Sequence, residues 1–409
     1  MTSPTGSAPQ PARPQPGQTE FIALIAMLFA TIAFSIDSML PALPQIAAEL
    51  TPDNINAAQL IVTSFVLGMG VGTFFAGPLS DAFGRKPVIM AGSLLFVAGA
   101  AAAWAAPTLE LLLIARVVQG LGVAAPRIVS IAMVRDLHSG RDMARVVSFA
   151  MMVFMLVPAV APAAGTVIIA AFGWRSLFIA FVIFAGVGCI WLGLRQPETL
   201  RPENRRPLRA GPLKAAFAEV ISYRVIVVST AVQALLFGVL FGTLSSTQQV
   251  FDITFGRGAT FPFWFAVIAV LAGSANFVNA RLVGRLGMRY LITTALGTQV
   301  ILSGAFATVT ALGLWPDALS FPAYVFWTTS VFFMTGLTIG NLNALALEPV
   351  GHIAGMAASI TAALATVLGV ALAVPLGLAF DGTPVPLMTG VSVLAALGWA
   401  LMRLIPRQG

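Results

Sequence analysis

The stretch RQPETLRPENRRPLRAGPLK, residues 195–214, is the longest polar connection in the chain, and the sequence on either side of it decides the fold. Six runs of largely apolar residues precede this connection and six follow it, most of them of about 20 residues or more, the length that a helix needs to cross a bilayer. The runs cover residues 20–41, 57–79, 86–106, 109–134, 143–170, 174–195, 223–246, 259–283, 288–311, 319–347, 351–380 and 384–405. Because peptide groups find no partner in hydrocarbon, each run is predicted to be a helix. The sequence therefore predicts an all-α membrane protein with twelve transmembrane helices in two six-helix bundles.

The composition indicates that lipid is the main solvent of this chain. Of its 409 residues, 58% are hydrophobic and 9% are charged, whereas a soluble domain carries about 25% charged residues. The single cysteine, Cys189, excludes a disulfide within the chain and a zinc site built on cysteines. The two histidines, His138 and His352, fall in polar connecting segments. We expect no metal and no cofactor.

The distribution of basic residues predicts the orientation. The chain has 22 Lys and Arg residues. All of them except Arg116, Arg127, Arg175 and Arg257 fall on the side of the predicted bundle that holds the N-terminus. This bias predicts that both termini are cytoplasmic. It also explains the net charge of +7 without nucleic acid, because these basic residues face anionic lipid.

The same spans divide the chain into four parts. Residues 1–19 are predicted to be a disordered cytoplasmic tail, since they are rich in Pro, Ser, Gly and Gln and lack the pattern of a cleavable signal. Residues 20–195 form the N-terminal bundle, residues 196–222 a cytoplasmic linker, and residues 223–405 the C-terminal bundle.

The loop GPLSDAFGRK, residues 77–86, joins the second and third predicted spans. Gly77 permits close helix approach, and Gly84 permits a reversal of the chain. Asp81 and Arg85 are four residues apart, so they can pair with each other or with a neighbouring helix end. An ordinary cytoplasmic loop with positive charge, including Lys86, is the alternative interpretation.

This loop resembles the signature loop of the major facilitator superfamily, where the acidic residue helps to hold the two halves together. The resemblance implies a gating role for Gly77, Asp81, Gly84, Arg85 and Lys86. The corresponding stretch of the second half, GRLGMR at residues 284–289, has Gly284 where the acid would stand.

Three further stretches resemble the Bcr/CflA-type drug:proton antiporters of bacteria. They are SIDSMLPALPQIAAEL (35–50), RVVQGLGVAAPRIVSIAMVRDL (116–137) and NLNALALEPVGHIAGMAASI (341–360). The fifth span reads LVPAVAPAAGTV (156–167), where the antiporters have Gly-Pro-x-x-Gly-Gly. Pro162 and Gly165 are present, Ala161 and Thr166 stand where the motif has glycines, and Pro158 precedes the stretch. These residues either belong to a coupling motif or kink the helix for packing alone.

Asp37 is the only acidic residue deep within a predicted span. Charged groups within membranes usually face a bundle interior or water and mark a transport pathway. Burial and a nearby arginine act in opposite directions on the proton affinity of a carboxyl group, so Asp37 is the leading candidate proton carrier. Counting at 1.5 Å per residue places Asp37 and Arg116 at about the same depth, on the order of 10 Å below the outer interface. The alternative is that Asp37 only neutralises Arg116.

The fourth predicted span carries a polar stripe. Arg116, Gln119 and Arg127 share one helical face, which we expect to point away from lipid. We interpret Arg116 mainly as the partner of Asp37 and secondarily as a substrate contact. Arg127 either binds substrate or reaches toward the cytoplasmic interface.

Amides within apolar runs complete the candidate set. Gln233, Asn276, Asn279 and Asn341 are candidate substrate-binding residues, with contacts between helices as the alternative role. Two arginines against one acid favour neutral, zwitterionic or weakly anionic cargo.

These features together predict a secondary transporter that exports small amphipathic molecules such as drugs in exchange for protons, by alternating access. A proton-coupled importer and a narrow-range metabolite exporter are the alternatives within transport. A membrane-embedded enzyme or sensor is more remote, because no acid–base or nucleophile cluster lies in the spans.

The expected partners are a small-molecule substrate and the lipid bilayer of the bacterial inner membrane, with a proton gradient as the energy source. We expect a monomer to suffice, since one chain supplies both bundles.

Overall fold

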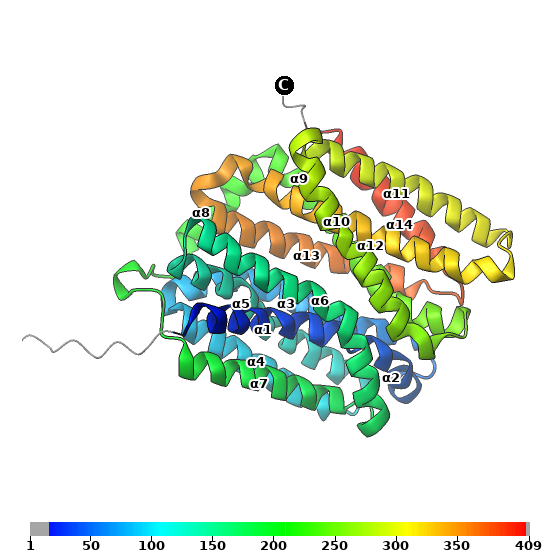
Figure 1. Ribbon diagram of the computed structural model, residues 1–409, viewed down its shortest axis with the longest axis horizontal. Helices are drawn as coiled ribbons and strands as arrows, with labels where there is room; N and C mark the ends of the chain where they lie inside the picture. The colour runs from blue at the N-terminus through cyan, green and yellow to red at the C-terminus, as the bar shows by residue number, and fades with distance from the viewer. Residues whose placement is uncertain (1–15, 209, 406–409) are drawn as a thin grey trace, which may run out of the picture.

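The computed structural model describes residues 16–208 and 210–405. Residues 1–15 of the predicted tail lie outside the described residues, and the first helix begins at Gln18. The described residues form helices, with no strand among them (Figure 1). The α-helices are α1 (Gln18–Asp37), α2 (Leu43–Leu50), α3 (Leu60–Phe83), α4 (Arg85–Trp104), α5 (Leu109–Leu137), α6 (Gly140–Phe172), α7 (Ser176–Arg195), α8 (Ala210–Ser222), α9 (Arg224–Gln249), α10 (Phe261–Leu286), α11 (Met288–Ala311), α12 (Asp317–Leu347), α13 (Ala354–Leu378) and α14 (Val385–Met402). The short helical segments are η1 (Leu40–Ala42), η2 (Ile55–Gln59), η3 (Pro202–Asn204), η4 (Val250–Thr254), η5 (Gly258–Thr260) and η6 (Glu348–Ile353).

Within the described residues, eleven segments are long and apolar enough to cross a membrane. One of them, Asp317–Leu378, has 62 residues and contains both α12 and α13, joined through η6. Backbone angles at Val350 are not helical, so the two helices are separate at this point. The segments therefore supply twelve long helices, and the predicted all-α membrane fold is confirmed.

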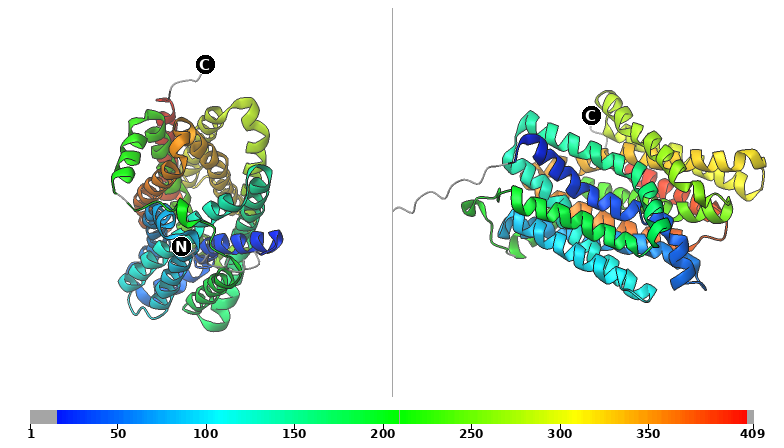
Figure 2. Two further views of the ribbon diagram at one scale, coloured as in Figure 1. Left: turned by 90° about the vertical axis from the view of Figure 1, so that its left-hand side faces the viewer. Right: turned by 60° about the horizontal axis from the view of Figure 1, so that its bottom comes forward.

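The long helices form two halves (Figures 1 and 2). The N-terminal half contains α1 and α3 to α7, and the C-terminal half contains α9 to α14. The halves meet mainly along two helix pairs, α3 with α13 and α6 with α10. We use "linker end" for the end of the molecule where η3 and α8 lie, and "distal end" for the opposite end, where η1, α2, η2 and η4 lie.

The helices within each half approach one another closely because glycines line their contacts. A Cβ atom added to Gly68 of α3 would lie 2.0 Å from the carbonyl oxygen of Val117, and one added to Gly120 of α5 would lie 2.0 Å from that of Phe65. No side chain fits in either place, so the α3–α5 contact depends on backbone meeting backbone.

The polar connection at residues 196–222 is more structured than the sequence indicates. Helix α8 occupies its last thirteen residues. Ala216 and Val220, one helical turn apart, are buried against Ile226 of α9 and Ala357 and Ile360 of α13. This second part of the predicted linker therefore packs on the C-terminal half.

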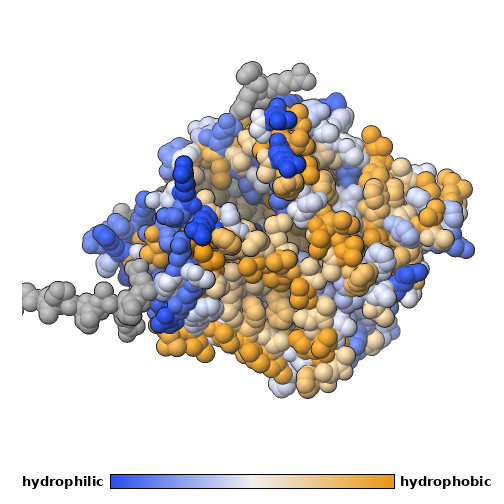
Figure 3. Space-filling view, viewed as in Figure 1, coloured by the Kyte–Doolittle hydropathy of each residue, from blue (hydrophilic) through white to orange (hydrophobic). Residues whose placement is uncertain are grey.

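The outward surface is that of a lipid-facing protein. Phe172, Leu194 and Ile301 are among many large apolar side chains that are exposed. Figure 3 shows hydrophobic residues over much of one face, with hydrophilic residues gathered toward the linker end. A soluble monomer does not expose an apolar surface of this extent.

Candidate functional site

Asp37 is the last residue of α1 and is 5% exposed. Across the described residues, no hydrogen bond or ion pair reaches its carboxyl group. The end of a helix carries the negative pole of the helix dipole, which does not favour a carboxylate. The structure thus places an acidic group in a buried position where nothing offsets a negative charge.

Arg116 of α5 is fully buried and ties three helices together. Its guanidinium donates to Gln119 Oε1 at 2.6 Å, to the Ser35 carbonyl oxygen of α1 at 3.2 Å and to the Ile61 carbonyl oxygen of α3 at 3.2 Å. The same group lies over the ring of Phe65, 4.3 Å from its centre. Each of the three guanidinium nitrogens therefore donates a hydrogen bond, and the face of the group contacts an aromatic ring.

The expected direct pairing of Asp37 with Arg116 is absent from this structure. Arg116 reaches α1 at Ser35, two residues before Asp37. The acceptor on α1 is thus a backbone carbonyl oxygen, and no ion pair joins the guanidinium to the Asp37 carboxyl. The charge of Arg116 is instead accommodated by carbonyl oxygens, an amide and an aromatic ring.

The antiporter-like residues of α6 pack directly behind the end of α1. A Cβ atom on Gly165 would lie 2.4 Å from the carbonyl oxygen of Ser38, the residue after Asp37. Pro162, one turn earlier, is buried, and α6 is helical through both Pro158 and Pro162. Gly165 therefore fixes how closely α6 approaches Asp37, a relation that the sequence did not reveal.

Gln119 and Arg127, the other two residues of the polar stripe on α5, lie in different surroundings. Gln119 is buried and binds Arg116, and its side-chain nitrogen has no partner among the described residues. Arg127 is exposed and contacts the sulfur of Met69 at 3.7 Å. Of the three residues of the stripe, only Arg116 and Gln119 are joined by a hydrogen bond.

Three of the four amide candidates bind other side chains of the C-terminal half. Asn341 donates to Asn279 Oδ1 at 2.7 Å, which joins α12 to α10, and Gln233 of α9 donates to Asn343 Oδ1 at 2.8 Å. Asn276 is exposed and contacts the sulfur of Met155 on α6 at 3.8 Å, across the two halves. Asn276 is thus the amide that remains most open to a ligand.

The loop at residues 77–86 is held by acids that the sequence analysis did not single out. Arg85 is 8% exposed and binds Asp81, Ser80 at 2.8 Å and Asp136 at 3.0 Å. The carboxylate of Glu198 accepts from the backbone N–H groups of Arg85 at 2.9 Å and of the next residue at 3.1 Å.

The glycines and the lysine of this loop have separate roles. Gly84 has φ of 105°, and a Cβ there would lie 2.6 Å from a Glu198 oxygen. Lys86 donates to the carbonyl oxygen of Gly193 at 2.7 Å. Gly77 lies against α13, where an added Cβ would be 3.3 Å from the Ser359 hydroxyl. Gly77 therefore contributes to the contact between the halves, whereas Asp81 binds Arg85 within its own half.

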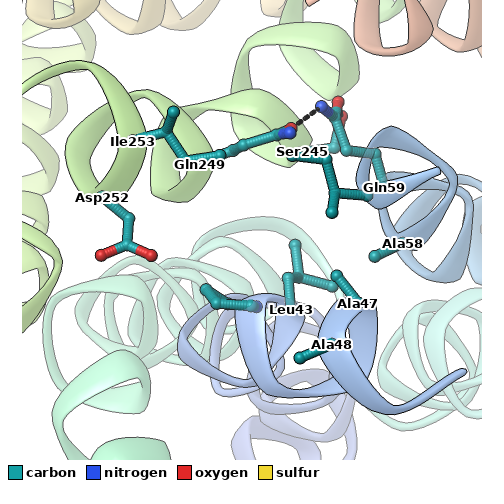
Figure 4. A pocket seen from close by; sticks show the side chains of 11 residues that line it. Leu43, Ala47, Ala48, Ala58, Gln59, Ser245, Gln249, Asp252 and Ile253 are labelled. Carbon is teal, nitrogen blue, oxygen red and sulfur yellow. Dashed lines mark hydrogen bonds between the residues drawn. The ribbon is translucent and has the colours of Figure 1, made fainter. Parts of the chain in front are cut away.

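Several hydrogen bonds join the two halves at the distal end, and Figure 4 shows the one between Gln59 and Gln249. Gln59 binds Gln249, and its carbonyl oxygen accepts from Ser246 at 2.9 Å and Ser245 at 3.3 Å. Gln249 donates in turn to Asn56 at 2.6 Å.

Asn56 extends this network to a third helix. Its amide donates to the carbonyl oxygens of Leu378 at 3.1 Å and Phe380 at 2.8 Å, at the end of α13. The sequence analysis missed these residues because polar side chains at span ends are ordinary.

Known proteins are similar to this chain in sequence and in fold. The family model for the Major Facilitator Superfamily matches residues 23–374. A bicyclomycin resistance protein homolog of Haemophilus influenzae is 30% identical over 358 residues, which is 85% of this chain and 86% of that protein. The multidrug resistance protein MdtL of Escherichia fergusonii is 29% identical over 345 residues, 82% of this chain and 83% of that protein.

The fold is similar to that of solved transporters. The structure of a D-xylose-proton symporter superposes with a TM-score of 0.78 at 15% identity, covering 95% of this chain and 98% of that one. This likeness concerns the fold alone, whereas the family match extends over most of the sequence. The chain therefore belongs to the major facilitator superfamily, and it is a membrane transporter rather than an enzyme.

Proposed function

We propose that this transporter exports small amphipathic molecules, drugs among them, from the bacterial cytoplasm in exchange for protons. The relatives named for resistance to bicyclomycin and to multiple drugs support this cargo class. The observation that carries the proposal is the Asp37 carboxyl, buried at the end of α1 with no cation against it.

Asp37 is suited to carry the proton. An unpaired buried charge is costly, and protonation removes that cost. The carboxyl takes up a proton from outside while the distal end is open and still holds it in this distal-closed conformation. It releases the proton when water reaches it from the cytoplasmic side. Exposed Arg127 and Asn276 are the proposed cargo contacts, while Arg116, Gln119 and the paired amides hold helices in place.

The two halves are the moving bodies in this mechanism. The N-terminal bundle comprises residues 20–195 and the C-terminal bundle residues 223–405, with both termini in the cytoplasm of a cell whose inner membrane holds the protein. The distal end then faces outward and is closed here by the bonds of Asn56, Gln59 and Gln249. A single chain and a proton gradient suffice, without a metal or cofactor.

Everted membrane vesicles test this function. In vesicles with an acidified lumen, addition of a cargo drug is expected to raise the luminal pH, because each cargo molecule that enters displaces protons. The measurement is the fluorescence of a pH-sensitive dye across a panel of hydrophobic drugs, with vesicles lacking the protein as control. Acidification by cargo addition would indicate a symporter instead, and no signal across a broad panel would contradict export of diverse drugs.

Loss of the Gln59 side chain is expected to open the distal end. The Gln59→Ala variant loses hydrogen bonds worth about 1 kcal/mol each, so the ratio of distal-open to distal-closed molecules rises roughly tenfold. The measurement is the labelling rate, by a membrane-impermeant maleimide, of a cysteine introduced by Ala58→Cys in a Cys189→Ser background. Ala58 is 2% exposed in this conformation, so its labelling reports opening.

The matched control is Gln45→Ala, which removes an exposed amide at the same end. Its labelling rate is expected to equal that of the parent. Equal rates in the Gln59→Ala and Gln45→Ala variants would show that Gln59 does not hold the distal end closed.

A further inference from the structure

A cavity of about 180 Å³ lies between the two halves at the distal end (Figure 4). One wall comes from α2 and η2 of the N-terminal half, and the other from the end of α9 and η4 of the C-terminal half. Leu43, Ala47 and Ala58 make the first wall largely apolar, and the bonded amides of Gln59 and Gln249 close one side. The cavity exists only while these two walls are together.

Asp252 of η4 lines this cavity and is exposed. No ion pair of Asp252 occurs among the residues that the structure describes. The carboxylate packs against Gly258, where a Cβ would lie 2.3 Å from its oxygen. It also borders a second cavity of about 250 Å³, and the residues lining the two cavities include no Lys, Arg or His.

The surrounding charges favour a cation at this place. The described residues of the distal end include two arginines, of which Arg175 binds Glu49 and Arg257 lies over the ring of Phe321. Apart from the buried Asp37, the acids at this end are Glu49, Asp53, Glu110, Asp252, Asp317 and Asp381. An excess of one sign of charge concentrates counter-ions in clefts with apolar walls.

We propose that this cavity binds a small organic cation that has a compact apolar body and an ammonium group paired with Asp252. The body lies between the alanines of α2 and Ile253, and the ammonium meets the carboxylate at the rim. Because both halves form the walls, the ligand binds the distal-closed conformation and holds it closed. The site is separate from Asp37 and does not depend on the direction of transport.

Binding to the purified protein tests the site with a matched pair of probes. Cyclohexylmethylamine, protonated at neutral pH, and cyclohexylmethanol share one apolar body and differ in charge. Titration calorimetry is expected to show roughly two- to fivefold tighter binding of the amine, the effect of one partly exposed ion pair. The Asp252→Asn variant is expected to lose this preference, whereas Asp53→Asn, which removes an acid of the same end outside the cavity, retains it.

Two further variants test the place and the conformation. Ala48→Leu fills the mouth of the cavity from an exposed position and is expected to abolish binding of both probes. Asn56→Ala loosens the distal closure without lining the cavity, so both probes are expected to bind more weakly. Equal affinity for amine and alcohol, or unchanged binding in the Asp252→Asn or Ala48→Leu variant, would overturn the proposal. Unchanged binding in the Asn56→Ala variant would contradict the claim that the probes bind only when the walls from both halves are together.

Discussion

Transport by the Asp37→Asn variant is expected to lose its dependence on the pH gradient. Uphill movement of cargo falls to background, while downhill exchange of cargo continues. Asparagine has nearly the shape of a protonated aspartate but cannot exchange a proton, so the halves still rearrange without coupling. The measurement is cargo accumulation in vesicles with and without an imposed pH gradient.

A stability measurement separates coupling from a structural role for Asp37. Removal of an unpaired buried carboxyl leaves no charge behind, so Asp37→Asn is expected to unfold at or above the parent temperature. If Asp37 served to neutralise Arg116, the same change would lower that temperature. Asp142→Asn, at an exposed position in the first turn of α6, is the control for loss of one acid. Gradient-driven accumulation at the parent level in Asp37→Asn would rule out the proposed carrier.

The twelve spans were predictable because their cause is local. An apolar run of about 20 residues has one stable arrangement in a bilayer, so the helices follow from hydropathy alone. Helix ends were less predictable, since α5 runs to Leu137 and α6 begins at Gly140, in polar sequence. Helix α8 was missed because Ala216 and Val220 are too few apolar residues to be noticed beside so many prolines and arginines.

The candidate site was predictable in its residues but less so in their contacts. Asp37 can be identified from the sequence because a charged residue in an apolar run is energetically costly, and such residues usually serve a function. Its relation to Arg116 did not follow, because Arg116 binds backbone carbonyl oxygens of Ser35 and Ile61, and every residue type offers those. Gln59 and Gln249 are 190 residues apart, and nothing in a single sequence links two such glutamines.

The loop at residues 77–86 shows the same limit. Its pairing of Asp81 with Arg85 follows from their spacing and is present. Asp136 lies in the last turn of α5 and Glu198 lies just after α7, so only the packing of those helices brings these two acids to Arg85. A resemblance to a family motif identified the loop without identifying what holds it.

Arg116 should prove the most sensitive structural position in the N-terminal half. The Arg116→Leu variant loses charged hydrogen bonds to three helices and the contact with Phe65, and we expect it to destabilise the protein by on the order of 3 kcal/mol or more. The measurement is the thermal unfolding midpoint of the purified protein, together with transport in vesicles. Leucine leaves Gln119 buried without its partner, which adds to the loss.

Arg116→Lys then distinguishes geometry from charge. Lysine keeps the positive charge but has neither the planar fork nor the ring contact of arginine, so it cannot serve Ser35, Ile61 and Gln119 at once. If Arg116 acts by holding helices together, the lysine variant is expected to unfold at a lower temperature and to transport more slowly. The transport that remains is expected to have the pH dependence of the parent protein. If it acts through its charge on Asp37, the lysine variant is expected to keep both the transport rate and the pH dependence of the parent protein. Because the guanidinium is directed at carbonyl oxygens rather than at the carboxyl, we expect the first result.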